Sequence, residues 1–437
     1  MTIHSIRQSA CLRGDVALPG DKSISHRALI LSSLAEGATK ITGLATGADV
    51  RATMGALRAL GTQINEAGGG VTIDGVGLRG LAPPASDLDC GNSGTTMRLL
   101  AGVLAGAGIR ATLDGDESLR RRPMGRVLEP LRAMGARALG AGSEGGDRER
   151  APLHLEGGRL RGADHRLPVA SAQLKTALLL AGLHAEGATR VWEPHLSRDH
   201  GERMLLAFGA DLRRDADGWI EIRPGALRSP GAIPIPGDAS SAAFLIAAAI
   251  LLPGSSIEIP NVGLNPTRTG WIEVLRRMHA RVESDAEGLA AGEPWGTMRA
   301  AGGGPLAAVD VAPEEIPALV DEVPILAVAA TQAHGTTTIR GAGELRVKES
   351  DRLAGIAVSL RRMGAAIDEL PDGLSIHGPT PLTGAEVDAD SDHRLAMSLA
   401  VAGLIASGET RIRGAEWADV SFPGFFEVLA KLSVPVR

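Results

Sequence analysis

The sequence predicts an α/β protein built from six similar β-α-β-α-β units that are shared among two or more domains. Its 437 residues exceed what one ordinary hydrophobic core holds. The same pattern of residues returns six times, about every 73 residues, which indicates an architecture of repeats. In each repeat a run rich in Ala and Leu, of helical length, alternates with short segments of alternating polarity that are typical of strands.

Each repeat opens with small polar residues, continues through the Ala- and Leu-rich run and passes a glycine into a short strand. The first repeat reads PGDKSISHRALILSSLAEGATKITGL, and the sixth reads DHRLAMSLAVAGLIASGETRIRGA. The openings lie at Pro19, Gly91, Pro168, Pro236, Glu322 and Asp392. The near identity of LPGDKS at the first opening with IPGDAS at the fourth favours two corresponding crossings between domains. The alternative is two ordinary turns from strand to helix.

A second helix is expected in the later half of most repeats. Amphipathic segments that end at glycine occur there, as in VRATMGALRALG, GRVLEPLRAMG and LAGIAVSLRRMG. Apolar residues such as Leu57 and Leu60 recur in them at helical spacing. A further strand often follows, as in residues 70–74, GVTID.

The composition excludes several classes of protein. A net charge of −6 and 2% aromatic residues, with no Tyr, argue against a nucleic-acid binder. Cys11 and Cys90 are the only cysteines and show no metal-ligand spacing, so neither disulfides nor a metal site is expected. The longest apolar run, Ala242 to Leu252, is too short to cross a bilayer. We expect a cytoplasmic protein with no membrane partner.

Cations gather where the repeats begin their helices. Helix N-termini present free N–H donors and partial positive charge, which suit phosphate and carboxylate groups. For any one of these cations the alternative is a solvated surface charge, but their recurrence at the same point of the repeat favours a site for a small, multiply charged anion. Lys22-Ser23 lacks the glycines of a Walker A loop, so nucleotide hydrolysis is not indicated. The cations concerned are Lys22, Arg27, Arg98, Arg122, Arg126, Lys348, Arg352 and Arg394.

Two carboxylates lie in sequence where they could move protons. Asp321 stands in LVDEVPILAVAA and Glu349 in KESDR, beside apolar or cationic residues that can tune a pKa. Asp321 has an alternative role as the cap of the following helix, and Glu349 as a first-turn acidic residue. His393 is either a donor to a developing charge or a buried core histidine.

Nine motifs taken in order resemble the 5-enolpyruvylshikimate-3-phosphate (EPSP) synthase family over residues 18 to 429. ASAQ-K and LSRDH resemble its bacterial branch often called class II. The motifs are PGDKSISHRALIL, GNSGTTMRLL, RRPMGRV, ASAQLKTALLLAGL, NPTRTG, DEVPILAVAA, ELRVKESDRL, DHRLAMSLAVAGL and SFPGFFEVL.

The resemblance implies the enolpyruvyl transferase fold: two similar domains of three β-α-β-α-β-β units each, with the ligand cleft between them. Residues 1–20 and 237–437 would form one domain, and residues 21–236 the other. The implied reaction transfers the enolpyruvyl group of phosphoenolpyruvate to the 5-hydroxyl of shikimate 3-phosphate. Phosphate leaves a tetrahedral intermediate, without metal or cofactor, in the biosynthesis of chorismate and aromatic amino acids. A monomer is expected.

The resemblance also assigns site residues by matching position. Asp321 and Glu349 would be the acid/base pair, with Lys22 and His393 beside the chemistry. Phosphoenolpyruvate would meet Lys22, Gly94, Arg122, Arg352, Arg394 and also Lys348. Shikimate 3-phosphate would meet Lys22, Ser23, Arg27, Ser171, Ala172, Gln173, Arg198, Asp321 and Lys348.

The chain departs from the family pattern at three places. Val420 stands where some members have Lys, Leu99 where the enteric branch has Pro, and Arg198 where some members place Tyr. The turn Asn92-Ser93-Gly94 carries glycine where some members have Ala, so we expect sensitivity to glyphosate, a competitor of phosphoenolpyruvate in this family.

Three other functions fit the sequence less well. An enolpyruvyl transferase acting on UDP-N-acetylglucosamine usually carries a Cys in a mobile loop, and the matching stretch GDESLRRRPMG has none. An RNA-end-processing protein is disfavoured by the acidic charge and the few aromatics. A non-catalytic repeat scaffold is disfavoured by the proton-transfer residues clustered with cations at helix starts.

Overall fold

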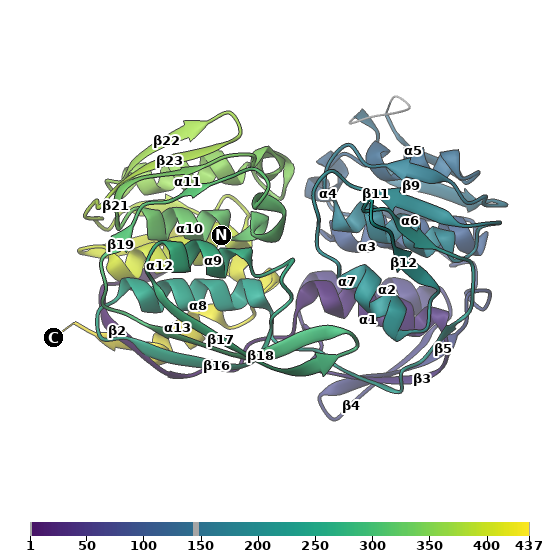
Figure 1. Ribbon diagram of the computed structural model, residues 1–437, viewed down its shortest axis with the longest axis horizontal. Helices are drawn as coiled ribbons and strands as arrows, with labels where there is room; N and C mark the ends of the chain where they lie inside the picture. The colour runs from purple at the N-terminus through teal and green to yellow at the C-terminus, as the bar shows by residue number, and fades with distance from the viewer. Residues whose placement is uncertain (1, 143–147, 437) are drawn as a thin grey trace. The chain divides into compact units, whose positions relative to one another are not determined.

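The computed structural model describes residues 2–142 and 148–436, which fold into two compact α/β units (Figure 1). Within the described part, unit 1 contains residues 2–19, 236–288 and 294–436, and unit 2 contains residues 20–235 and 289–293. Each unit has its own hydrophobic core. No helix among the described residues is long and apolar enough to span a membrane.

The second repeat of unit 2 shows the common plan. Its sheet has the order β6-β7-β9-β8, in which the first two strands are parallel and the other pairs are antiparallel. One helix connects β6 to β7 and another connects β7 to β8, and the short α4 (Glu117–Arg121) is an addition. The elements are β6 (Leu88–Asp89), α3 (Gly94–Ala107), β7 (Ala111–Asp114), α5 (Gly125–Ala133), β8 (Arg137–Ala141) and β9 (Arg150–Gly157).

The third repeat of unit 2 follows the same plan, with sheet order β10-β11-β13-β12. Its elements are β10 (Asp164–Arg166), α6 (Ala172–Gly182), β11 (Thr189–Trp192), α7 (His200–Ala207), β12 (Leu212–Arg214) and β13 (Ile220–Ile222).

In the first repeat the opening strand comes from far along the chain. Two short strands near the end of unit 2 pair in parallel with β3 and take the place of the missing strand. The elements are α1 (Lys22–Leu34), β3 (Ala35–Thr42), α2 (Ala48–Ala59), β4 (Gln63–Ala67), β5 (Gly70–Val76), β14 (Leu227–Arg228) and β15 (Ala232–Pro234).

Unit 1 repeats the plan with two strands from the start of the chain. β2 runs parallel to β16 and opens the fourth repeat, while β1 pairs antiparallel with β25 in the sixth. The fourth repeat comprises β2 (Ser9–Asp15), α8 (Ala239–Leu251), β16 (Ser256–Gly263), α9 (Gly270–Arg277), β17 (Arg281–Ala290) and β18 (Glu293–Ala301).

The other two repeats of unit 1 have sheets in the orders β19-β21-β23-β22 and β1-β25-β24. The fifth comprises β19 (Leu306–Ala307), β20 (Asp310–Val311), α10 (Val323–Ala330), β21 (Ala333–Ile339), α11 (Arg352–Arg362), β22 (Ala366–Leu370) and β23 (Gly373–Gly378). The sixth comprises β24 (Glu386–Asp388), α12 (His393–Ile405), β25 (Glu409–Arg413), β1 (Ile3–Arg7) and α13 (Phe425–Leu432), after which β26 (Ser433–Pro435) pairs with β2. The predicted α/β fold of six repeats is confirmed.

The Ala- and Leu-rich helices form the centre of each unit and are buried nearly all round, as their apolar composition predicts. α3 and α6 approach closely: a Cβ added to Gly102 would lie 2.2 Å from the carbonyl oxygen of Ala177. Because the sides of these helices are buried against apolar residues, their first turns are where polar side chains and free N–H groups can meet a ligand.

Candidate active site

The residues expected at the site lie at or near helix N-termini in both units. In unit 2 they belong to the starts of α1, α3 and α6 and to the loops after α4 and β11. In unit 1 they belong to the 3₁₀ turn Val320–Glu322 and to the starts of α11 and α12. Side-chain caps hold these starts; for example, Oδ1 of Asp21 accepts from the Ile24 N–H at 2.9 Å.

The first two turns of α1 present two cations. Lys22 is the first helical residue, and its ammonium lies 3.2 Å from Asp49 Oδ2 of α2. Arg27, one turn later, is buried and donates to the carbonyl of half-buried Ser23 at 3.0 Å and to Thr176 Oγ1 at 3.1 Å. Burial lowers the pKa of Arg27 to about 10, although nearby carboxylates, Glu202 first, oppose the shift. A buried cation of this kind is stabilised by an anionic ligand.

The start of α6 is joined to α3 by side chains. Ser171 caps α6, Ala172 is its first residue, and Gln173 accepts from Arg98 at 2.8 Å. The Gln173 amide also donates to Thr95 Oγ1 at 2.9 Å. Gln173 is therefore held in place before any substrate arrives.

Gly94 begins α3 beside two arginines. A Cβ at this position would lie 2.8 Å from Arg98 Nη1 and 3.3 Å from Arg122 Nη1. Arg122 follows α4, is 8% exposed and donates to the Asn92 side chain. The missing side chain thus leaves room directly in front of two guanidinium groups.

Arg198 lies in a loop anchored by a buried ion cluster. The Lys175 ammonium, fully buried, lies 2.7 Å from both Glu193 and Glu202 and donates to the Ser197 carbonyl at 3.4 Å. Burial raises the pKa of Glu202, and Lys175 opposes this shift. The cluster fixes the backbone on the N-terminal side of Arg198.

In unit 1, three arginines converge on Asp321. Arg352 Nη1 lies 3.0 Å from Oδ1, whereas Arg268 Nη1 and Arg394 Nη2 lie 3.5 and 3.4 Å from Oδ2. All three arginines are nearly buried. Asp321 is not the N-cap residue of α10, because Glu322 occupies that position, and the Glu322 side chain makes no capping bond. The alternative role as a helix cap is therefore wrong.

Glu349 and Asp392 complete the surroundings of Arg352. Arg352 Nη2 lies 2.6 Å from Glu349, and Nε lies 2.7 Å from Asp392. Burial would lower the pKa of Arg352, but the carboxylates of Asp392, Glu349 and Asp321 more than offset it and raise the pKa. Glu349 lies before α11, whose cap is Asp351, so its carboxylate serves Arg352 rather than the first turn of the helix.

His393 and Lys348 are the remaining residues expected at the site in unit 1. His393 is the first residue of α12 and is 2% exposed, and Arg394 follows it. Lys348 is half-buried after the 3₁₀ helix Gly343–Val347 and directly precedes Glu349. No group of three or more His, Cys, Asp or Glu in residues 2–142 and 148–436 is arranged to hold a metal ion.

Several polar residues of these groups carry no sequence signal that would assign them to the site. Asp49 pairs with Lys22, and Arg268 joins Asp321 to the α8 cap Asp238, which accepts from Arg268 Nη2 at 3.1 Å. The motif NPTRTG contains Arg268, but its spacing gives no sign of these partners. Glu322 also accepts from Arg394, at 3.3 Å.

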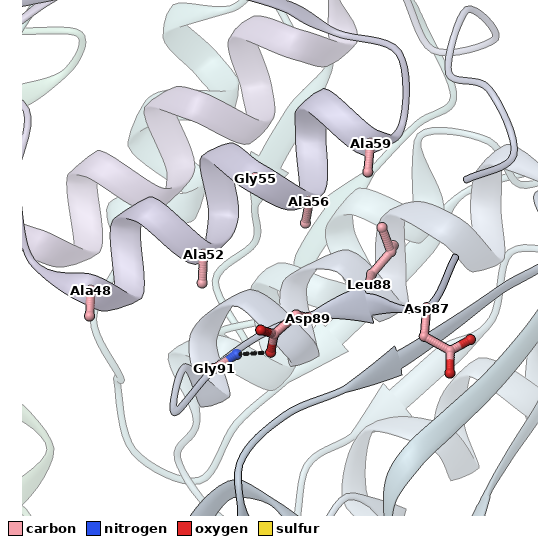
Figure 2. A pocket seen from close by; sticks show the side chains of 9 residues that line it. All are labelled: Ala48, Ala52, Gly55, Ala56, Ala59, Asp87, Leu88, Asp89 and Gly91. Carbon is pink, nitrogen blue, oxygen red and sulfur yellow. Dashed lines mark hydrogen bonds between the residues drawn. The ribbon is translucent and has the colours of Figure 1, made fainter. Parts of the chain in front are cut away.

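An open depression beside α2 is separate from these groups. Figure 2 shows that the small residues Ala48, Ala52, Gly55, Ala56 and Ala59 form one wall, opposite the β6 segment with Asp87 and Asp89. None of the expected site residues lines it, and its walls offer no cation to a phosphate.

Comparisons with known proteins agree on one family. The family model of EPSP synthase (3-phosphoshikimate 1-carboxyvinyltransferase) matches residues 6–429. A 3-phosphoshikimate 1-carboxyvinyltransferase of Synechococcus sp. (strain JA-3-3Ab) is 54% identical over 97% of this chain and 95% of its own length. A relative of the same name from Brevibacillus brevis is 48% identical over 98% of this chain and 99% of its own length.

Solved structures agree with this result. EPSP synthase from Acinetobacter baumannii superposes with a TM-score of 0.87 at 40% identity, covering 100% of this chain and 99% of that one. The enolpyruvyl transferase NikO from Streptomyces tendae shares the fold. It is 21% identical and superposes with a TM-score of 0.77 over 98% of this chain and 97% of that one.

Proposed function

Because this chain belongs to the EPSP synthase (3-phosphoshikimate 1-carboxyvinyltransferase) family, it transfers the enolpyruvyl group of phosphoenolpyruvate to shikimate 3-phosphate, and we propose that the two groups of side chains described above carry the reaction. The reaction joins two multiply charged anions. Their repulsion must be offset by cations in desolvated surroundings, where electrostatic interactions are strong.

Shikimate 3-phosphate is held chiefly by the unit 2 group in this proposal. Buried Arg27 supports a phosphate or hydroxyl contact, and the preset amide of Gln173 supports orientation of the ring. Asp321 and Lys348 of unit 1 complete the set. The proposed ligands are Lys22, Ser23, Arg27, Ser171, Ala172, Gln173, Arg198, Asp321 and Lys348.

Phosphoenolpyruvate is held by arginines, which bind carboxylate and phosphate in bidentate fashion. The space in front of Gly94, next to Arg122, supports one contact. The proposed ligands are Lys22, Gly94, Arg122, Lys348, Arg352 and Arg394.

The proton transfers are assigned to Asp321 and to either Lys22 or Glu349. Asp321 takes the proton of the 5-hydroxyl of shikimate 3-phosphate while that hydroxyl oxygen bonds to C2 of phosphoenolpyruvate. At the same time Lys22 or Glu349 gives a proton to C3. From the tetrahedral intermediate phosphate leaves C2, and the methyl at C3 returns a proton to Lys22 or Glu349 as the double bond is restored. His393 lies next to Arg394 and donates to charge that develops during these steps.

The observation that carries this proposal is the position of Asp321, one carboxylate in contact with Arg268, Arg352 and Arg394. Release of phosphate from phosphoenolpyruvate tests the reaction. Shikimate 3-phosphate should support it, and UDP-N-acetylglucosamine should not. The reverse preference would contradict the function.

We propose that the two compact units are the two domains of the family fold, and that the chain is a cytoplasmic monomer. Light scattering after size-exclusion chromatography tests the oligomeric state.

A further inference from the structure

The arginines that contact Asp321 differ in what else they do. Arg352 and Arg394 lie in the first turns of α11 and α12 and are proposed ligands of phosphoenolpyruvate. Arg268 comes from the loop that precedes α9 and has no part in substrate binding as proposed above. It is nevertheless as deeply buried as Arg352, with 2% of its surface exposed.

The Arg268 loop is built to hold one conformation. Asn265 Oδ1 accepts from the N–H of Thr267 at 2.9 Å and from its hydroxyl at 2.8 Å. The N–H of Arg268 itself donates to the Asn265 carbonyl at 2.8 Å. Both Asn265 and Thr267 are buried. The guanidinium of Arg268 is thus carried on a rigid turn rather than on a flexible surface loop.

The guanidinium connects Asp321 to a second fixed point. Nη2 lies 3.1 Å from Asp238 Oδ1, the oxygen that caps α8 by accepting from the Ser240 N–H at 2.8 Å. Nη1 lies 3.5 Å from Asp321 Oδ2 and 3.7 Å from Glu322 Oε1. Arg268 therefore spans the start of α8 and the turn that carries Asp321.

We propose that Arg268 is the positioning residue of Asp321, an inference that rests on the function proposed above. When an anionic substrate binds Arg352 and Arg394, these two cations contact the substrate in place of Asp321. Arg268 stays on Oδ2, while Oδ1, previously held by Arg352, becomes available to accept the hydroxyl proton. The base is thus freed only where substrate is bound, and Arg268 keeps it from turning away.

The test compares Arg268→Lys with Arg268→Gln, using shikimate 3-phosphate and phosphoenolpyruvate. An ammonium keeps the charge but lacks the planar fork that reaches two carboxylates at once. We expect kcat to fall at least about tenfold in Arg268→Lys and further in Arg268→Gln, in the range for a misplaced general base. The Michaelis constant for phosphoenolpyruvate should change by less than about threefold. The acidic limb of the kcat profile should move to higher pH, because the cation that favours ionised Asp321 is weakened or lost.

Arg299→Lys and Arg299→Gln are the matched controls. Arg299 also joins two carboxylates of unit 1, Glu258 at 2.6 Å and Asp285 at 2.5 Å, but it lies in β18 away from Asp321 and is partly exposed. Its variants should leave kcat and the pH profile unchanged. Circular dichroism and melting temperature establish whether each variant is folded. If Arg268→Gln does not fold, Arg268→Lys alone tests the proposal.

The outcomes separate this inference from the function itself. A wild-type chain that releases no phosphate contradicts the proposed function. Active wild type with folded Arg268 variants whose kcat stays within about twofold and whose pH profiles superpose overturns only the role of Arg268. A rise in the Michaelis constant at constant kcat also overturns it, since that would make Arg268 a support for binding alone.

Discussion

Lys22 combines a helix start and partial burial, with a side-chain exposure of 18%, and its ammonium forms an ion pair with Asp49. Such an ammonium can exchange one carboxylate for another, or for substrate. We expect Lys22→Ala to lower kcat by about 10² or more, as for loss of a group that stabilises developing charge. Steady-state phosphate release measures this. Lys431→Ala, which removes an exposed lysine, is the control, and equal activity of the two variants would exclude Lys22 from the reaction.

Gly94 allows a sharper experiment, because a single methyl would enter a space bounded by Arg98 and Arg122. Glyphosate is longer than phosphoenolpyruvate, so crowding should affect the inhibitor more. We expect Gly94→Ala to raise the glyphosate inhibition constant by a larger factor than the Michaelis constant for phosphoenolpyruvate. Inhibition kinetics with phosphoenolpyruvate as the varied substrate measure both constants.

Gly55→Ala is the control for that experiment, since a Cβ at Gly55 meets nothing within 4 Å. Equal increases of the two constants in Gly94→Ala would show that the turn does not distinguish inhibitor from substrate.

Among the elements, α6 and the loop before α7 depend on one buried cation. Replacing Lys175 with Met leaves Glu193 and Glu202 buried without it. We expect a loss of about 3–5 kcal/mol of unfolding free energy, as for removal of one partner of a buried pair. Urea denaturation measures the loss, and calorimetry should show weaker binding of shikimate 3-phosphate because the Arg198 loop is released.

Lys40→Met, at an exposed position of β3, is the matched control and should be close to neutral. Recovery of part of the lost stability in Lys175→Met/Glu193→Gln would identify the stranded charge as the cause. A Lys175→Met chain within about 1 kcal/mol of wild type would contradict the argument, because it would mean that the carboxylates are satisfied otherwise.

The central helices were predictable from local sequence, whereas the opening strands of two sheets were not. Ala- and Leu-rich runs predict buried helices in any context, and all six are present. β15 is only Ala232–Pro234 and acquires its role by pairing with β3, nearly two hundred residues earlier. No local pattern specifies a partner at such a distance.

The site residues likewise divide into those that local sequence predicts and those that depend on distant partners. Cations and carboxylates at helix starts could be predicted, because the helices themselves were. Arg268 was not assigned, because its partners Asp238 and Asp321 lie 30 and 53 residues away and only the packing of α8 and α10 brings them to it. Asp49 could not be assigned for the same reason, since it lies in α2 and its partner Lys22 lies in α1.

At the scale of the molecule, unit 2 should lose stability in acid. Burial, and then Arg79, lowers the pKa of His184 to about 4, and burial likewise lowers that of His26 and His165. His184 of the unfolded chain binds a proton below its ordinary pKa of 6.5, whereas His184 of the folded chain binds one only near pH 4. The free energy of unfolding therefore falls as the pH is lowered through this window. For His184 the cost at pH 5 is up to about 2 kcal/mol.

Urea unfolding at pH 7 and pH 5 tests this, with His184→Gln expected to show a smaller difference between the two values than wild type. The comparison across pH cancels any packing cost of the substitution. Equal losses in both proteins would show that His184 does not contribute.

The pairing of β1 with β25 has a consequence for synthesis. Ile3 lies opposite Arg413, so the strand Ile3–Arg7 leaves the ribosome long before its neighbour exists. Residues 20–235 can meanwhile collapse around their own core, because domains fold as units during translation. β1 and β2 must wait as unpaired edges, the kind of segment that invites aggregation and chaperone binding. β1 and β2 are thus made long before the strands with which they pair, and translation speed, rather than final stability, sets how long they remain at risk.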